Sequence, residues 1–252
     1  MATGFIYIIT SVNRNYEQKQ FCKVPTFLEK RLFFGTCKVA MRRKMMHGDY
    51  VFGISHSMKH KPRRVVFATK IAECIRFAEA YRRFPKLRGS DKDSGGPIHV
   101  QPISMPGLPF PQCDYEHIPG ATHDNRWVKD LATRDLDRFF VGELQDGWFG
   151  RWLGQKGPEI DQDIMRVLKT CSVYNKVGSE LSRQNHDATQ ENPIAYRCLN
   201  RGLHLETSEP EALIELLNGR MAGIPLDSGI GNVEADITKP GRNKRSSCKS
   251  SC

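Results

Sequence analysis

The chain has 252 residues and a formal net charge of +10, with 39% hydrophobic and 26% charged residues. This balance is typical of a globular protein with a sizeable core, and it excludes collagen-like and fully disordered chains. Residues 1–88 hold 19 Lys and Arg against 5 Asp and Glu, whereas residues 89–238 hold 14 against 23. The basic first third predicts a surface that binds a polyanion, with a merely solvated basic face as the alternative.

The apolar segments and the cysteines indicate the cellular compartment in which we expect the protein. No apolar run approaches membrane-spanning length, and no hydrophobic leader precedes the first expected strand. The 8 cysteines form no Cys-x-x-Cys pair, so we expect free thiols in a reducing cytoplasm. Cys113, His117 and His123 are the one loose group resembling metal ligands, but their spacing is irregular. We therefore expect no metal and no cofactor.

The chain begins with an apolar run, Phe5 to Val12, which predicts a buried strand. Asn13 and Arg14 follow it and could offer amide and guanidinium donors to a ligand, or could simply form a turn. Pro25 predicts a short helix that runs to Arg31, because proline is favoured in the first helical turn. Leu32 to Phe34 then read as a short strand.

The next stretch, residues 36–73, is strongly basic. Thr36 is a suitable N-cap for a helix that runs to His47 and ends at Gly48. Two strands rich in β-branched and aromatic residues follow, at Tyr50–Ile54 and Val65–Ile71. The cations expected at the surface of this helix and of the connection between the strands are Lys38, Arg42, Arg43, Lys59, Arg63 and Arg64.

The remaining elements are spread over a longer and less regular sequence. Helical spacing predicts helices before Pro85, at residues 159–171 and at residues 209–217. Short strands are expected at residues 98–100 and 139–141, and the second of these precedes a turn signal at residues 145–147.

Two groups of side chains in this part could carry chemistry. His117, His123 and Asp124 are candidates for acid–base work, although a loop histidine bonded to the backbone is the simpler reading. Trp148 stands in an aromatic group that could stack on a flipped or single-stranded base, or could instead cap the core.

Four short motifs occur in a recognisable order. They are Tyr7-Ile8-Ile9, Thr36-Cys37-Lys38 with Arg42-Arg43, Gly48-Asp49-Tyr50-Val51-Phe52-Gly53, and Trp148-Phe149-Gly150. Over roughly residues 4 to 170 the chain thereby resembles the nucleotide modification associated domain family, type 2. It also resembles the wider PUA-like superfamily, which includes ASCH and EVE modules. The resemblance implies a ligand class, modified nucleobases, and an association with phage and mobile-element systems, but not a reaction.

The fold that this resemblance implies is α+β. We expect a PUA-like mixed β-barrel with packed helices and a small helical C-terminal extension. The predicted boundaries are residues 1–172 for the barrel domain, 173–226 for a helical or irregular extension, and 227–252 for a disordered basic tail.

The function we expect is recognition of DNA or RNA that contains a modified base, with no membrane partner. The cations named above would position the phosphate backbone, while Trp148 would stack on the base. The side chains expected to read the base edge are Asn13, Arg14, Ser55 and His56.

Two alternatives belong to other functional classes. One is an enzyme acting on a nucleobase or nucleotide, with His117, His123 and Asp124 as its acid–base groups. The other is a protein-interaction module of a phage or defence operon, docking a partner on the acidic second half. The sequence carries no phosphate-binding loop, no Gly-x-Ser-x-Gly elbow and no zinc deaminase signature, so no motif specifies an enzyme.

Overall fold

The computed structural model describes ten segments of the chain, and every structural statement below concerns these. They are residues 1–9, 25–35, 39–55, 62–89, 97–103, 114–118, 136–144, 146–174, 179–180 and 204–224. No helix in these segments is both long and apolar enough to cross a membrane.

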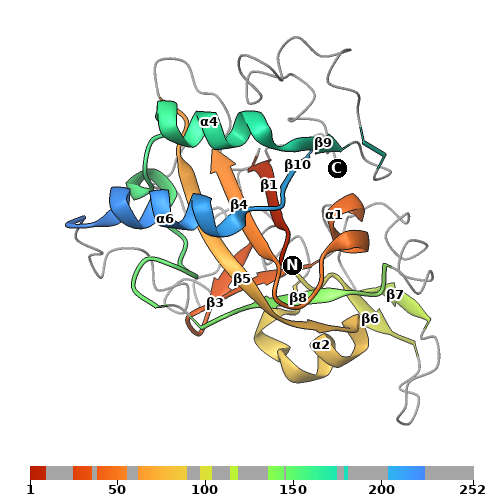
Figure 1. The fold of residues 1–252 in the computed structure, drawn as a ribbon. Coiled ribbons are helices and arrows are strands. Elements are labelled where there is room, and N and C mark those ends of the chain that lie inside the picture. Colours follow the sequence, from red (N-terminus) through yellow and green to blue (C-terminus); the bar gives the residue numbers. More distant parts are fainter. Residues whose placement is uncertain are drawn as a thin grey trace.

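The described elements are short strands with a few helices between them (Figure 1). The strands are β1 (Gly4–Ile9), β2 (Thr26–Leu28), β3 (Arg31–Phe34), β4 (Tyr50–Ser55), β5 (Val65–Ile75), β6 (Val100–Pro102), β7 (Tyr115–His117), β8 (Phe139–Gly142), β9 (Ser172–Tyr174) and β10 (His204–Thr207). The helices are α1 (Val39–Lys44), α2 (Phe77–Arg83), α4 (Gln162–Thr170) and α6 (Pro210–Met221), with 3₁₀ turns η1 (Pro85–Leu87) and η3 (Gly154–Lys156).

Eight of the strands form one mixed sheet in the order β2-β3-β8-β5-β4-β1-β10-β9. Strands β1 and β4 are parallel, and the other neighbours in this sheet pair antiparallel. Strands β2 and β9 lie at opposite ends, so over the described residues the sheet is open. The prediction of a closed barrel is therefore wrong, whereas the α+β class is confirmed.

Helices cover this sheet, so it can bury its faces without closing on itself. Helices α4 and α6 run side by side across one face (Figure 1). Successive side chains of a strand point to opposite faces, and Ile6 and Ile8 of β1 point toward these helices. There they share a buried cluster with Ile164 and Leu168 of α4 and Leu213 of α6.

The other face of β1 is buried as well. Phe5, Tyr7 and Ile9 belong to a second cluster, which includes Met41 of α1 and Met45 directly after that helix. A strand buried on both faces reads as a continuous apolar run. The predicted first strand is thereby confirmed as far as Ile9, and its last three residues lie outside the described segments.

A third cluster lies where α2 and the β6–β7 hairpin pack on the end of the sheet near β3 and β8. Its centre is aromatic: the ring centroids of Phe77 and Phe139 are 5.5 Å apart, and those of Phe33 and Phe139 are 6.2 Å apart. Here a long strand, β5, pairs with β4 through its first half and with β8 through its second half.

Most predicted elements are present, with one helix replaced by a hairpin. The predicted strands at Tyr50–Ile54 and Val65–Ile71 correspond to β4 and β5. The helix predicted from Pro25 to Arg31 is wrong, because this segment forms the β2–β3 hairpin. Its turn residues Glu29 and Lys30 have φ values of 48° and 61°, as the tight left-handed turns of two-residue hairpins require.

Strand β10 joins the two ends of the described chain in one sheet. It pairs with β1 on one side and with β9 on the other. The predicted boundary after residue 172 falls inside β9, which pairs with β10 in the same sheet, and the division into domains stays a prediction. The predicted basic tail, residues 227–252, lies outside the described segments.

Candidate functional site

Some of the cations predicted at the surface are engaged in structural contacts. Arg42 is only 1% exposed, and its Nη1 donates to the carbonyl oxygen of Leu136 at 3.0 Å. Arg64 donates from Nη1 to the carbonyl oxygen of Gly157 at 2.8 Å and forms an ion pair with Glu159. By contrast, Arg43 is exposed on α1.

The structure brings Ser55 and Arg64 together. Ser55 is buried, and its Oγ accepts a hydrogen bond from the backbone N–H of Arg64 at 2.9 Å. The neighbouring Arg63 is half-buried, and burial lowers the pKa of its guanidinium. Ser55 therefore closes the end of a hairpin and is not presented to solvent.

Trp148 lies against α6. Its Nε1 donates to Oδ1 of Asn218 at 3.0 Å, and its ring meets that of Phe149 edge to face at 5.6 Å. Within the described segments, no hydrogen bond or ring contact joins Trp148 to Ser55, Arg63 or Arg64.

Of the remaining predicted site residues, only His117 lies in a described segment. His117 is half-buried at the end of β7. The others lie outside the described segments: Asn13, Arg14, Lys38, His56, Lys59, His123 and Asp124.

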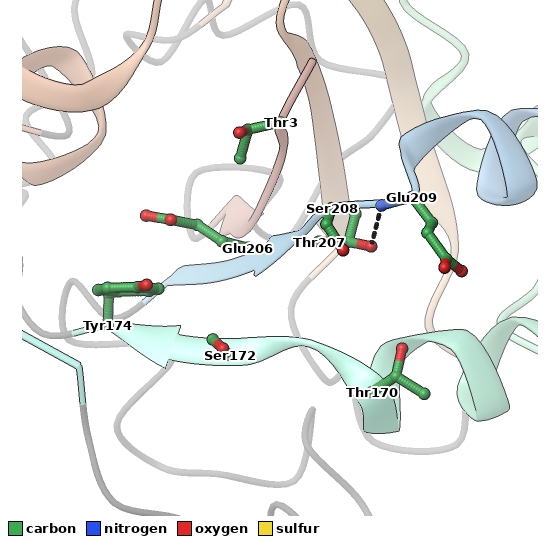
Figure 2. A pocket seen from close by; sticks show the side chains of 8 residues that line it. All are labelled: Thr3, Thr170, Ser172, Tyr174, Glu206, Thr207, Ser208 and Glu209. Carbon is green, nitrogen blue, oxygen red and sulfur yellow. Dashed lines mark hydrogen bonds between the residues drawn. The ribbon is translucent and has the colours of Figure 1, made fainter. Parts of the chain in front are cut away.

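A cavity of about 410 Å³ opens elsewhere, where the first residues of the chain meet β9 and β10 (Figure 2). Its wall is formed by five parts of the chain: the segment before β1, the end of α4, strand β9, strand β10 and the start of α6. The lining residues are polar: Thr3, Thr170, Ser172, Tyr174, Glu206, Thr207, Ser208 and Glu209.

The Glu206 carboxylate at this wall is held by two partners. Lys44 Nζ donates to Oε1 at 2.9 Å and to Oε2 at 3.1 Å, and His204 Nε2 lies 3.0 Å from Oε1. A carboxylate only accepts, so Nε2 carries the proton in this contact. Burial alone would raise the pKa of Glu206, but the hydrogen bonds from His204 and Lys44 outweigh it and hold the pKa below its ordinary value. Glu206 is therefore ionised at neutral pH.

Tyr174 is fixed by the same groups. Lys44 Nζ lies 3.2 Å from the centroid of the Tyr174 ring, and the His204 ring stacks on it at 5.6 Å with an interplanar angle of 14°. Such a cation–π contact is stabilising because the ring face is negative. The arrangement makes this end of the cavity a preorganised wall.

Hydroxyls and carboxylates dominate the lining, so the cavity offers hydrogen-bond donors and acceptors to a ligand. Within the described segments, no three His, Cys, Asp or Glu side chains are grouped closely enough to hold a metal ion.

The sequence matches the family model of nucleotide modification associated domain 2 over residues 5–184, more than half of the chain. The chain belongs to this family. The resemblance inferred from the four motifs is thus confirmed. No curated protein and no solved structure matched the chain.

The Gly48-Asp49 motif of this nucleotide modification associated domain helps to build the cavity. Gly48 has φ +89°, which lets the chain turn after α1. Asp49 is buried, and it accepts from the N–H of Thr3 at 2.9 Å and from that of Met46 at 2.8 Å. One carboxylate therefore ties Thr3, in the cavity wall, to the end of the helix that carries Lys44.

The domain's sheet also uses residues beyond the family match. Strand β10, which supplies His204 and Glu206, follows residue 184, yet it lies between β1 and β9. Sequence reasoning missed these residues because β10 has only four residues and a strand signal of that length is weak. The alternation of His204 and Glu206 around Leu205 was the available signal.

Proposed function

We propose that this protein recognises a nucleobase within DNA or RNA, with a modified base as the expected target, and that the cavity receives the base. Membership of the nucleotide modification associated domain 2 family is the observation that carries the proposal. A base inside a duplex would have to leave its stack to enter, while a single-stranded base would not.

The dimensions and lining of the cavity support this role. Sites for small ligands usually have volumes of about 300–1,000 Å³, and this cavity has about 410 Å³. Base edges present hydrogen-bond donors and acceptors, which side-chain hydroxyls and carboxylates can match. Tyr174 and Glu206 are already fixed by Lys44 and His204, so little side-chain entropy is lost on binding.

The phosphate backbone would be held by cations outside the cavity. Arg43 is exposed on α1, one residue before the Lys44 that reaches the cavity wall. Lys38, Lys59 and Arg63 from the same basic third remain in the proposed backbone set.

Trp148 is not part of the proposed base site. It is bonded to Asn218, nine residues along α6 from Glu209. Because a helix rises about 1.5 Å per residue, Asn218 lies about 13 Å along the helix from Glu209, which lines the cavity.

The test is an equilibrium titration of the full chain with labelled single strands and duplexes of DNA and RNA at several salt concentrations. We expect affinity to fall steeply as salt rises, because phosphate contacts release counterions. Arg43→Gln should reduce the salt slope by about one unit. Arg166→Gln is the control, since Arg166 is exposed on α4 and paired with Asp163. Weak binding without salt dependence would remove the proposal.

A further inference from the structure

The charge of the cavity wall indicates which class of ligand the cavity can bind. Glu206 and Glu209 contribute two carboxylates, and the described residues that line the cavity include no Lys or Arg. Lys44 is tied to Glu206 and offsets that charge. Glu209 is exposed and forms no ion pair with the described residues. The wall is therefore neutral at one end and negative at the other, where Figure 2 shows Glu209 apart from Glu206 and Tyr174.

The two helix ends at the cavity do not make it an anion site. The C-terminal end of α4, which presents Thr170, carries a partial negative charge. The start of α6 carries a partial positive charge, but its first residue, Pro210, has no N–H to donate. The N–H of Glu209 is already bonded to Thr207 Oγ1 at 3.0 Å (Figure 2). The lining hydroxyls could donate to a phosphate, but no cation among the described lining residues would offset its charge, and the Glu209 carboxylate would repel it.

We infer that the cavity selects a base that carries an exocyclic amino group and leaves the phosphate outside. This inference rests on the proposed function and names its substrate class. An ionised carboxylate can only accept hydrogen bonds, so its natural partner is an N–H donor. Cytosine presents an amino group of this kind, which Asp and Glu side chains accept from in nucleic-acid complexes. Adenine and guanine also carry one, whereas uracil and thymine do not.

Glu209 is the carboxylate that distinguishes these ligands. Both oxygens of Glu206 already accept from Lys44, and one also accepts from His204, which leaves it limited capacity for a ligand. The Glu209 side chain makes no hydrogen bond to the described residues, and only its backbone N–H is bonded. Its oxygens are therefore available to an amino group in the cavity.

The test is calorimetric titration of the full chain with cytidine, adenosine, guanosine, uridine, thymidine and cytidine 5′-monophosphate. We expect the three amino-bearing nucleosides to bind at least about fivefold more tightly than uridine and thymidine, because a charged hydrogen bond is at stake. The monophosphate should bind no more tightly than cytidine. Glu209→Gln should weaken cytidine binding by a similar factor and leave uridine binding unchanged.

Glu211→Gln is the matched control, because Glu211 is exposed in the first turn of α6 and does not line the cavity. Equal affinity for cytidine and uridine, tighter binding of the monophosphate, or an unchanged cytidine affinity in Glu209→Gln would overturn the inference. So would the absence of nucleoside binding. If oligonucleotides still bind with a salt slope in that case, the substrate class is wrong and the proposed function stands. If they do not, both fail.

Discussion

At the scale of single residues, Asp137 holds α2 against the β6–β7 hairpin, at the end of the sheet near β3 and β8. It is 8% exposed, and it accepts from Tyr115 Oη at 2.9 Å and from the Phe77 N–H at 2.9 Å. Tyr115 Oη in turn accepts from the N–H of Ala78 at 3.1 Å. One carboxylate thus connects the first turn of α2 to β7.

Removing this carboxylate should be costly. Asp137→Ala leaves the Phe77 N–H and the Tyr115 hydroxyl without their acceptor, so we expect a loss of about 3 kcal/mol in the free energy of unfolding. Urea unfolding measures it. Asp146→Ala is the control at an exposed turn position and should change stability by less than about 0.5 kcal/mol. A loss as small as the control's would mean that the network is not formed.

Asp137 and Glu206 should give stability opposite dependences on pH. Burial raises the pKa of Asp137 above 3.8, so its contribution is present below that pH and is lost as pH rises through the raised pKa. Although burial opposes it, hydrogen bonding lowers the pKa of Glu206 below 4.5, so its contribution is present above that pH and is lost as pH falls through the lowered pKa.

The measurement is unfolding at a series of pH values for the wild type, Asp137→Asn and Glu206→Gln. Relative to Asp137→Asn, the wild type should lose stability as pH rises above 3.8. Relative to Glu206→Gln, it should lose stability as pH falls below 4.5. Differences of the same sign for both variants would contradict the hydrogen-bond arrangement at Glu206.

Gly53 in β4 is the last residue of one family motif, and the close packing around it explains why a glycine stands there. A Cβ at Gly53 would lie 2.1 Å from the Phe67 ring and 2.6 Å from Ile9, both in the core. Gly53→Ala should therefore cost about 1–3 kcal/mol by overpacking, as measured by thermal or urea unfolding. Gly219 of α6 has nothing within 4 Å, so Gly219→Ala should be neutral or stabilise by up to about 1 kcal/mol. Equal effects at the two sites would show that Phe67 moves freely.

At the scale of elements, β10 completes the sheet between β1 and β9, and α6 packs beside α4 on one face of that sheet. A chain ending at residue 184 loses β10, and with it the pairing of β1 with Leu205 and its neighbours. It also exposes the α4 surface that α6 covers. We expect this chain to aggregate or unfold, whereas a chain ending at residue 226 keeps every described element and should fold.

Circular dichroism and gel filtration of the two truncated chains decide this prediction. A stable monomer ending at residue 184 would show that the family match is a complete folding unit, and that β10 is an addition to it.

The elements that the sequence predicted are those with a strong local signal. The apolar runs of β1, β4 and β5 and the amphipathic α4 carry periodicity that survives tertiary packing. Strand β3 was predicted at Leu32–Phe34, but its hairpin partner β2 was missed because the turn residues Glu29 and Lys30 adopt positive φ without a glycine or asparagine to indicate a turn. The open sheet could not be distinguished from a barrel, because closure depends on which edge strands meet.

At the scale of the whole molecule, the cavity draws on segments that no sequence pattern links. Thr3, the pair Ser172 and Tyr174, and the stretch from Glu206 to Glu209 meet only because β10 enters the sheet between β1 and β9. The clustered cations were visible in the sequence, but the burial of Arg42 was not. A basic run does not say which side chain turns toward the core.

The central claim is that the cavity between β9, β10 and the first residues of the chain receives the base. Ultraviolet crosslinking of a bound oligonucleotide to the full chain, followed by mass spectrometry of its peptides, tests this directly. We predict base adducts in the segments Ser172–Tyr174 and Glu206–Glu209. Adducts confined to the segment around Trp148, with none in these two, would contradict the account.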